Sequence, residues 1–95
     1  MVRAMSKDQQ AELEVFIEAK CSLCQRALRM AADVDDRYPE LSVRVIDISE
    51  PAAQRDDVFA VPTFILDGRV VSLGNPKQSF LRSEIETLLQ RRSSR

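Results

Sequence analysis

The pattern of residues 13–49 constrains the fold more than any other part of the chain. The run 13–19, LEVFIEA, is short and dense in β-forming residues, as in a buried strand. After Cys21 the apolar residues recur with the period of a helix, and Pro39 marks the end of that helix. The run 41–49, LSVRVIDIS, is again rich in Val and Ile. Two strands joined by a helix favour a right-handed βαβ unit with parallel strands. The apolar residues of the helical face are Cys24, Ala27, Leu28, Ala31 and Val34.

The second half of the chain predicts a short helix, a hairpin and a terminal helix. Pro51 suits the first turn of a short helix that extends to about Phe59. In the run 61–73, Asp67-Gly68 separates two apolar segments and is a strong signal for a tight hairpin. The last segment offers Asn75 as an N-cap, followed by Pro76 at the first helical position. The predicted order is therefore β-α-β-α-β-β-α, an α/β fold with a mixed four-stranded sheet flanked by helices.

The composition fits one small domain. The 95 residues are 44% hydrophobic and 31% charged, with a formal net charge of −1. We expect a polar extension over 1–12, a domain over 13–90 and a frayed basic tail over 91–95. Charges of both signs are interspersed and form no basic stripe, so nucleic acid is not expected as a partner. The stretch 58–66 is too short for a membrane span, and the polar N-terminus lacks the apolar core of a signal peptide, so we expect a cytoplasmic protein.

Cys21 and Cys24 are the two cysteines of the chain, and histidine is absent. The lack of histidine excludes Cys/His nucleophile pairs, Ser/His/Asp triads and mixed Cys/His zinc sites. A structural zinc site would need a second ligand pair, and hence a dimer. Copper(I) chaperones usually carry a methionine two residues before the first cysteine, where this chain has Ala19. Redox chemistry is the favoured interpretation, with metal binding and simple packing as alternatives.

The position of the cysteines between a strand and a helix indicates how such chemistry would proceed. Amide groups and the positive end of the helix dipole at the first turn favour a thiolate at Cys21. Cys24 lies about one helical turn further on, so its sulfur can approach that of Cys21. Cys21 would attack a substrate disulfide, and Cys24 would resolve the mixed disulfide and leave a Cys21–Cys24 bridge.

The run Val61-Pro62-Thr63, taken with the cysteine pair before a helix, resembles the thioredoxin superfamily. The resemblance covers about 13–89, and the segments FILDG and LGNPK look most like small glutaredoxin-like thioredoxins of prokaryotes. It implies a cis peptide bond between Val61 and Pro62. It also implies a substrate platform that faces the cysteines, where the main chain of Val61 binds an extended substrate segment. The expected substrate-binding residues are Val61, Pro62, Ser22 and Leu23.

The chain departs from the family pattern at several positions. Ser22-Leu23 replaces the Gly-Pro of typical thioredoxins and the Pro-Tyr of typical glutaredoxins, and Lys20 stands where thioredoxins carry tryptophan. Val15 occupies the place of their buried aspartate, and neither Glu18 nor Asp47 is expected to act as a base. The glycine pair with which glutaredoxins bind glutathione is reduced to a single glycine, so a protein disulfide is the expected substrate.

These observations predict a thiol-disulfide oxidoreductase whose redox-active group is the Cys21–Cys24 disulfide and which needs no other cofactor. The expected partners are disulfide-containing proteins and a thiol or flavoprotein reductase, and the protein is expected to be a monomer. A redox-sensitive interaction module without turnover remains an alternative.

Overall fold

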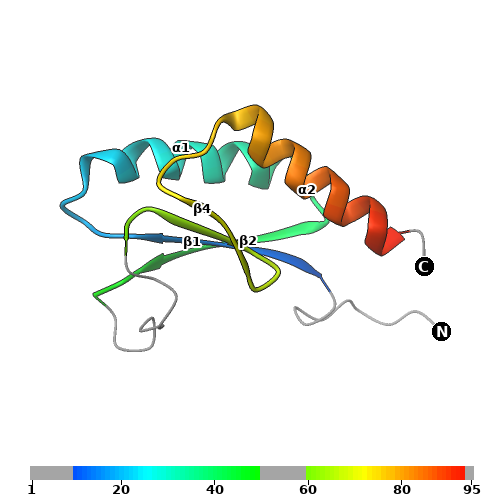
Figure 1. Ribbon diagram of the computed structural model, residues 1–95, viewed down its shortest axis with the longest axis horizontal. Helices are drawn as coiled ribbons and strands as arrows, with labels where there is room; N and C mark the ends of the chain where they lie inside the picture. The colour runs from blue at the N-terminus through cyan, green and yellow to red at the C-terminus, as the bar shows by residue number, and fades with distance from the viewer. Residues whose placement is uncertain (1–9, 50–59, 94–95) are drawn as a thin grey trace.

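In a computed structural model, residues 10–49 and 60–93 are described and form two helices on one side of a four-stranded sheet (Figure 1). The elements are β1 Ala11–Ile17, α1 Ser22–Arg37, β2 Leu41–Asp47, β3 Thr63–Leu66, β4 Arg69–Leu73 and α2 Gln78–Ser93. The strand order across the sheet is β2-β1-β3-β4. The predicted mixed four-stranded sheet is confirmed. The predicted short helix over 51–59 lies outside the described residues.

The sheet combines one parallel pair with two antiparallel pairs. β1 runs parallel to β2, from Ala11 opposite Leu41 to Ile17 opposite Asp47, which confirms the parallel pairing predicted for the βαβ unit. β3 is antiparallel to both β1 and β4. The first strand lies two residues earlier than the predicted 13–19, because residues after Ile17 form the turn into α1.

The hairpin between β3 and β4 turns at the predicted dipeptide. Asp67 and Gly68 both have positive φ, 51° and 84°, the conformation that a tight hairpin turn of this kind requires. The turn is also fastened to the start of β1. The Asp67 N–H donates to the Glu12 carbonyl at 2.7 Å, and the Glu12 N–H donates to the Asp67 carboxylate at 2.9 Å.

α1 lies along the sheet and buries one face against it (Figure 1). The helix stops at Arg37 because Pro39 follows, and the N–H of Tyr38 closes the last turn on the Val34 carbonyl at 2.9 Å. The predicted apolar face is right except at its edge, where Leu28 is 36% exposed and Met30 is buried instead. The buried residues of α1 are Cys24, Ala27, Met30, Ala31 and Val34.

α2 begins later than predicted. Its first residue is Gln78, and the Leu81 N–H bonds to the Lys77 carbonyl at 3.0 Å, so Asn75 is not the N-cap and Pro76 is not the first helical residue. Instead the side chain of Asn75 bonds across to α1, and a tertiary contact has won over the local capping signal. α2 also continues to Ser93, beyond the predicted domain end at residue 90.

The core lies mainly between the sheet and the two helices. Leu13 and Val15 of β1 and Phe64 of β3 point to this side and are fully buried, together with Leu81 and Ile85 of α2. A smaller cluster on the opposite face is centred on Phe16 and Ile65, against which Ile46, Ile48 and Val70 pack. Over the described ranges, neither helix has the length and apolar character needed to cross a membrane.

Candidate functional site

The turn that leads from β1 into α1 places Cys21 at the start of the helix. The N–H of Cys21 donates to the Glu18 carbonyl at 3.1 Å and so closes the turn. Cys21 is the N-cap residue, with φ −89° and ψ 116°, and its side chain makes no capping hydrogen bond. The first turn of α1 contains no acidic residue. The thiol therefore stands at the positive end of the helix dipole without a competing carboxylate in that turn.

The two cysteines differ in how open they are to solvent. Cys21 is half-buried, whereas Cys24 is 3% exposed and belongs to the buried face of α1. Both are free thiols, and the Cys24 N–H donates to the Cys21 carbonyl at 3.1 Å. Burial raises the pKa of the Cys24 thiol, and its hydrogen bond with the Cys21 side chain raises it further. The accessible thiol is that of Cys21, and Cys24 lies behind it as a protonated thiol.

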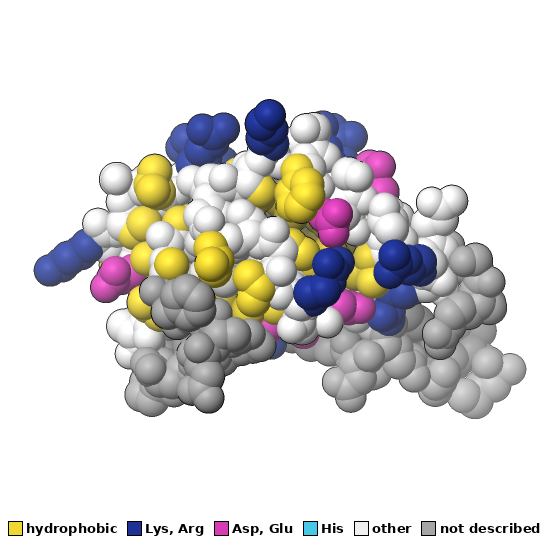
Figure 2. Space-filling model, viewed as in Figure 1, with side chains coloured by type: hydrophobic (Ala, Val, Ile, Leu, Met, Phe, Trp, Pro, Cys, Tyr) yellow, Lys and Arg dark blue, Asp and Glu magenta, His cyan; other side chains and the backbone are white. Residues whose placement is uncertain are grey.

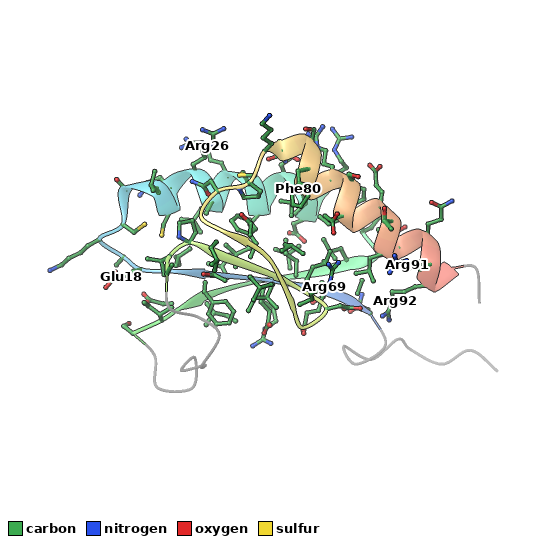
Figure 3. The ribbon with its side chains drawn as sticks, in the orientation of Figure 1. Glu18, Arg26, Arg69, Phe80, Arg91 and Arg92 are labelled. Carbon is green, nitrogen blue, oxygen red and sulfur yellow. The ribbon has the colours of Figure 1, made fainter. Side chains whose placement is uncertain are left out.

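The acidic residues near the turn lie at its margin. Glu18 is exposed, and Figure 3 shows its side chain at the end of β1, directed away from α1. The Asp47 carboxylate accepts the N–H of Ser49 at 2.9 Å, and this bond lowers its pKa. Val15, which the resemblance sets in the place of a buried aspartate, is fully buried in the core. On α1 itself, Arg26 projects outward, away from the sheet (Figure 3).

The Val61–Pro62 peptide bond, which the resemblance implies to be cis, is cis in the structure. Pro62 is buried and Val61 is half-buried, just before β3 begins at Thr63. The hydroxyl of Thr63 is itself fully buried and donates to the Ala60 carbonyl at 2.5 Å. Pro62 therefore stands directly before the start of a strand.

The loop 74–77 after β4, here called the connecting loop, links the proline segment with the cysteine turn, residues 18–24. The N–H of Gly74 donates to the Pro62 carbonyl at 2.7 Å, and the Asn75 side-chain amide donates to the Leu23 carbonyl at 3.0 Å. Gly74 has a φ of 95°, which an L side chain rarely adopts, so glycine suits the turn at this position. The contact of Asn75 was missed because it joins residues far apart in the sequence, and no local pattern signals it.

The other predicted site residues lie on the surface around Cys21. Ser22 is exposed and Leu23 is 59% exposed, an unusual degree for a large apolar side chain. Leu73, which precedes the connecting loop, is 52% exposed and was not predicted as a site residue. Within residues 10–49 and 60–93, no group of three or more His, Cys, Asp or Glu side chains could hold a metal ion.

Comparison with known proteins identifies one family for this fold and this pair of cysteines. The model of a family described as "Thioredoxin domain" matches residues 11–86. None of the curated proteins matches.

Three solved thioredoxins have a similar structure. A thioredoxin h from poplar is 27% identical with a TM-score of 0.72, over 87% of this chain and 79% of the poplar chain. Fasciola hepatica thioredoxin is 25% identical with a TM-score of 0.69, over 83% of this chain and 81% of that one. The oxidised form of mitochondrial thioredoxin 3 from Saccharomyces cerevisiae is 23% identical with a TM-score of 0.68, over 82% and 78% of the two chains.

Proposed function

Because the chain belongs to the thioredoxin family, we propose that it is a thiol-disulfide oxidoreductase that reduces protein disulfides through a reversible Cys21–Cys24 disulfide. The observation that carries the proposal is the unequal burial of the pair. Cys21 reaches solvent at the N-terminus of α1, and Cys24 lies behind it at 3% exposure. Such an arrangement separates an attacking thiol from a resolving thiol.

The reaction has two thiol–disulfide exchange steps. The Cys21 thiolate attacks one sulfur of the substrate disulfide, and the other sulfur leaves as a thiolate. Cys24 then attacks the sulfur of Cys21, the bond between Cys21 and the substrate breaks, and the proton of Cys24 goes to the departing thiolate. Two electrons pass to the substrate and the protein keeps a Cys21–Cys24 disulfide. The raised pKa of Cys24 holds this thiol in reserve until the mixed disulfide forms.

The substrate platform consists of Val61, Pro62, Ser22 and Leu23. The bonds of the connecting loop to Pro62 and to Leu23 support this assignment, because they hold the two segments side by side. Hydrophobic side chains gather on the same end of the molecule, where β1 leads into α1 (Figure 2). An extended substrate segment would pair with the main chain at Val61 and rest on the exposed side chain of Leu23.

The substrates are disulfide-containing proteins, and a thiol or a flavoprotein reductase returns electrons to the pair. The redox-active disulfide serves as the sole redox group, and the protein acts as a cytoplasmic monomer. A close relation to small glutaredoxin-like thioredoxins of prokaryotes belongs to the same proposal. One solved structure with this fold comes from work on a yeast mitochondrial 1-Cys peroxiredoxin and its thiol resolution by glutathione and thioredoxin systems.

The test is turnover of a protein disulfide by Cys21→Ser and Cys24→Ser variants, with a dithiol as electron source. Cys21→Ser should be inactive, and Cys24→Ser should accumulate a mixed disulfide that mass spectrometry detects. Full turnover by either variant would contradict the mechanism. Stoichiometric zinc or copper(I) in freshly purified reduced protein would favour the metal alternative. Partner binding that follows the redox state without turnover would favour an interaction module.

A further inference from the structure

The side chain of Asn75 lies between the connecting loop and the cysteine turn with its two ends in different surroundings. Its nitrogen, Nδ2, donates to the carbonyl oxygen of Leu23 at 3.0 Å, at the rim of the site. Its oxygen, Oδ1, is buried and accepts no hydrogen bond from any residue that the structure describes. The amide is therefore held by one bond, and that bond reaches the segment between the two cysteines.

The bond from Asn75 acts on the peptide unit that carries the N–H of Cys24. The Leu23 carbonyl and the Cys24 N–H belong to one planar peptide, and that N–H donates to the Cys21 carbonyl at 3.1 Å. A continuous chain of hydrogen bonds thus runs from Asn75 through the Leu23–Cys24 peptide to Cys21. Hydrogen bonds in such a chain strengthen one another, so the Asn75 amide adds to the bonds that orient this peptide at the start of α1.

The buried oxygen indicates that Asn75 is not there for stability alone. A buried carbonyl oxygen without a donor destabilises a folded protein, and an apolar side chain of the same shape would avoid this cost. Nor does Asn75 cap α2, which begins at Gln78. The remaining structural effect of this side chain is its hold on the cysteine turn.

We propose that Asn75 is a positioning residue that sets the approach of Cys24 to the sulfur of Cys21 in the mixed disulfide. The inference rests on the proposed function. In the step concerned, the Cys24 sulfur forms a bond to the Cys21 sulfur, the bond from Cys21 to the substrate breaks, and the substrate sulfur departs with the proton of Cys24. A peptide held in one orientation leaves the Cys24 sulfur fewer conformations to sample before it attacks the Cys21 sulfur.

The test uses dithiobis(nitrobenzoate), a small coloured disulfide, and the Asn75→Leu variant, which keeps the shape of the side chain and removes both polar atoms. Attack by Cys21 releases one coloured thiolate, and resolution by Cys24 releases a second in a separate phase. The second phase should be about fivefold slower in the variant, the factor expected for one lost hydrogen bond. The first phase should be unchanged. The midpoint of thermal unfolding should not fall, because the unpartnered oxygen is gone.

The matched control is Ser72→Ala, which removes the bond from the Ser72 hydroxyl to the Gly74 carbonyl at 2.7 Å in the same loop. This variant should keep the wild-type ratio of the two phases. An unchanged second phase in Asn75→Leu, or equal slowing in Ser72→Ala, would overturn the inference. If the leucine variant does not fold, the rate of the second phase is measured in Asn75→Ala instead. A wild-type protein that releases a single thiolate would instead reject the proposed function, so the two failures are distinguishable.

Discussion

The two ends of the molecule are held together by different kinds of bond. At the cysteine end, which comprises residues 18–24, 60–63 and 72–75, neutral side chains donate to backbone carbonyls, as Asn75 does to Leu23 and Ser72 to Gly74. At the far end, where α1 finishes and the hairpin turns, carboxylates take part in the contacts. Its side-chain bonds include Tyr38 to Glu86 at 2.5 Å, Arg69 to Glu84 at 3.2 Å and Arg92 to Asp67 at 3.1 Å. Figure 3 shows Arg69, Arg91 and Arg92 around the second half of α2.

The difference lies in the side chains that make the bonds and not in the charge of the segments, because Glu18 and Lys20 both lie at the cysteine end. An ion pair beside Cys21 would add its own electrostatic field to that of the helix N-terminus. The bond from Asn75 to the Leu23 carbonyl holds two segments of the cysteine end together without adding such a field. The far end carries no proposed chemistry, so its contacts can involve charge.

The largest effect is expected from a substitution in the core that joins the two ends. Ile85 of α2 is fully buried in the cluster that also contains residues of α1, and Ile85→Ala should lower the free energy of unfolding by about 2–5 kcal/mol. Urea denaturation followed by circular dichroism measures the loss. Alkylation of Cys24 should rise at the same urea concentration, because both ends share this core.

The control for this prediction is Leu28→Ala, which truncates a side chain already 36% exposed on α1. It should cost less than about 1 kcal/mol. Cys24 that becomes reactive well before the helical signal is lost would show that the cysteine end unfolds by itself.

The two glycines with positive φ give a sharper comparison, because one lies at each end. Gly68 has a φ of 84° at the hairpin turn and Gly74 a φ of 95° beside Pro62, and an added Cβ would meet no atom within 4 Å at either. Substitution by alanine should therefore cost each variant about 1–2 kcal/mol of stability through backbone strain. Only Gly74→Ala should also slow reduction of a protein disulfide, since backbone strain there would disturb the bond from the residue-74 N–H to the Pro62 carbonyl. Equal activity of the two variants would argue against a role for the connecting loop.

Much of the fold could be predicted because its signals are local. The run of β-forming residues around Val15, the Asp67-Gly68 turn and the helical repeat after Cys21 are each local in the sequence. The start of α2 could not be predicted in this way. Asn75-Pro76 carries the local signature of a helix start, but the amide of Asn75 bonds to Leu23, 52 residues away, and the helix begins at Gln78.

The same distinction applies to the candidate site. Cys21 and Cys24 could be selected from the sequence because they are separated by two residues and lie at the start of the predicted helix. The difference in burial between the two cysteines depends on the packing of α1 against the sheet. The helical period of the apolar residues predicted that Cys24 lies on the buried face. The exposed Leu73 and the link from Gly74 to Pro62 depend on the return of β4 beside β3, so no window of sequence contains them.

The smallest effect is expected at Tyr38, whose hydroxyl donates to the Glu86 carboxylate across the two helices. Burial, and then the hydrogen bond to Glu86, raise its pKa from 10.0 to about 12. Tyr38→Phe should lower the free energy of unfolding by about 1 kcal/mol at neutral pH, the value of one such bond. It should leave disulfide exchange unchanged, because the residue lies at the far end.

The pH dependence of this bond follows from its sign. The folded protein holds the phenolic proton more tightly than the unfolded chain, so the stabilisation is complete below pH 10 and is lost as the pH rises towards about 12. Over that range the tyrosine of the unfolded chain ionises, whereas the folded protein keeps its proton because a phenolate would face the Glu86 carboxylate. The advantage of the wild type over Tyr38→Phe in urea should therefore shrink between these values, while other groups titrate alike in both proteins. A constant difference would show that the pKa of Tyr38 is the same in the folded protein and in the unfolded chain.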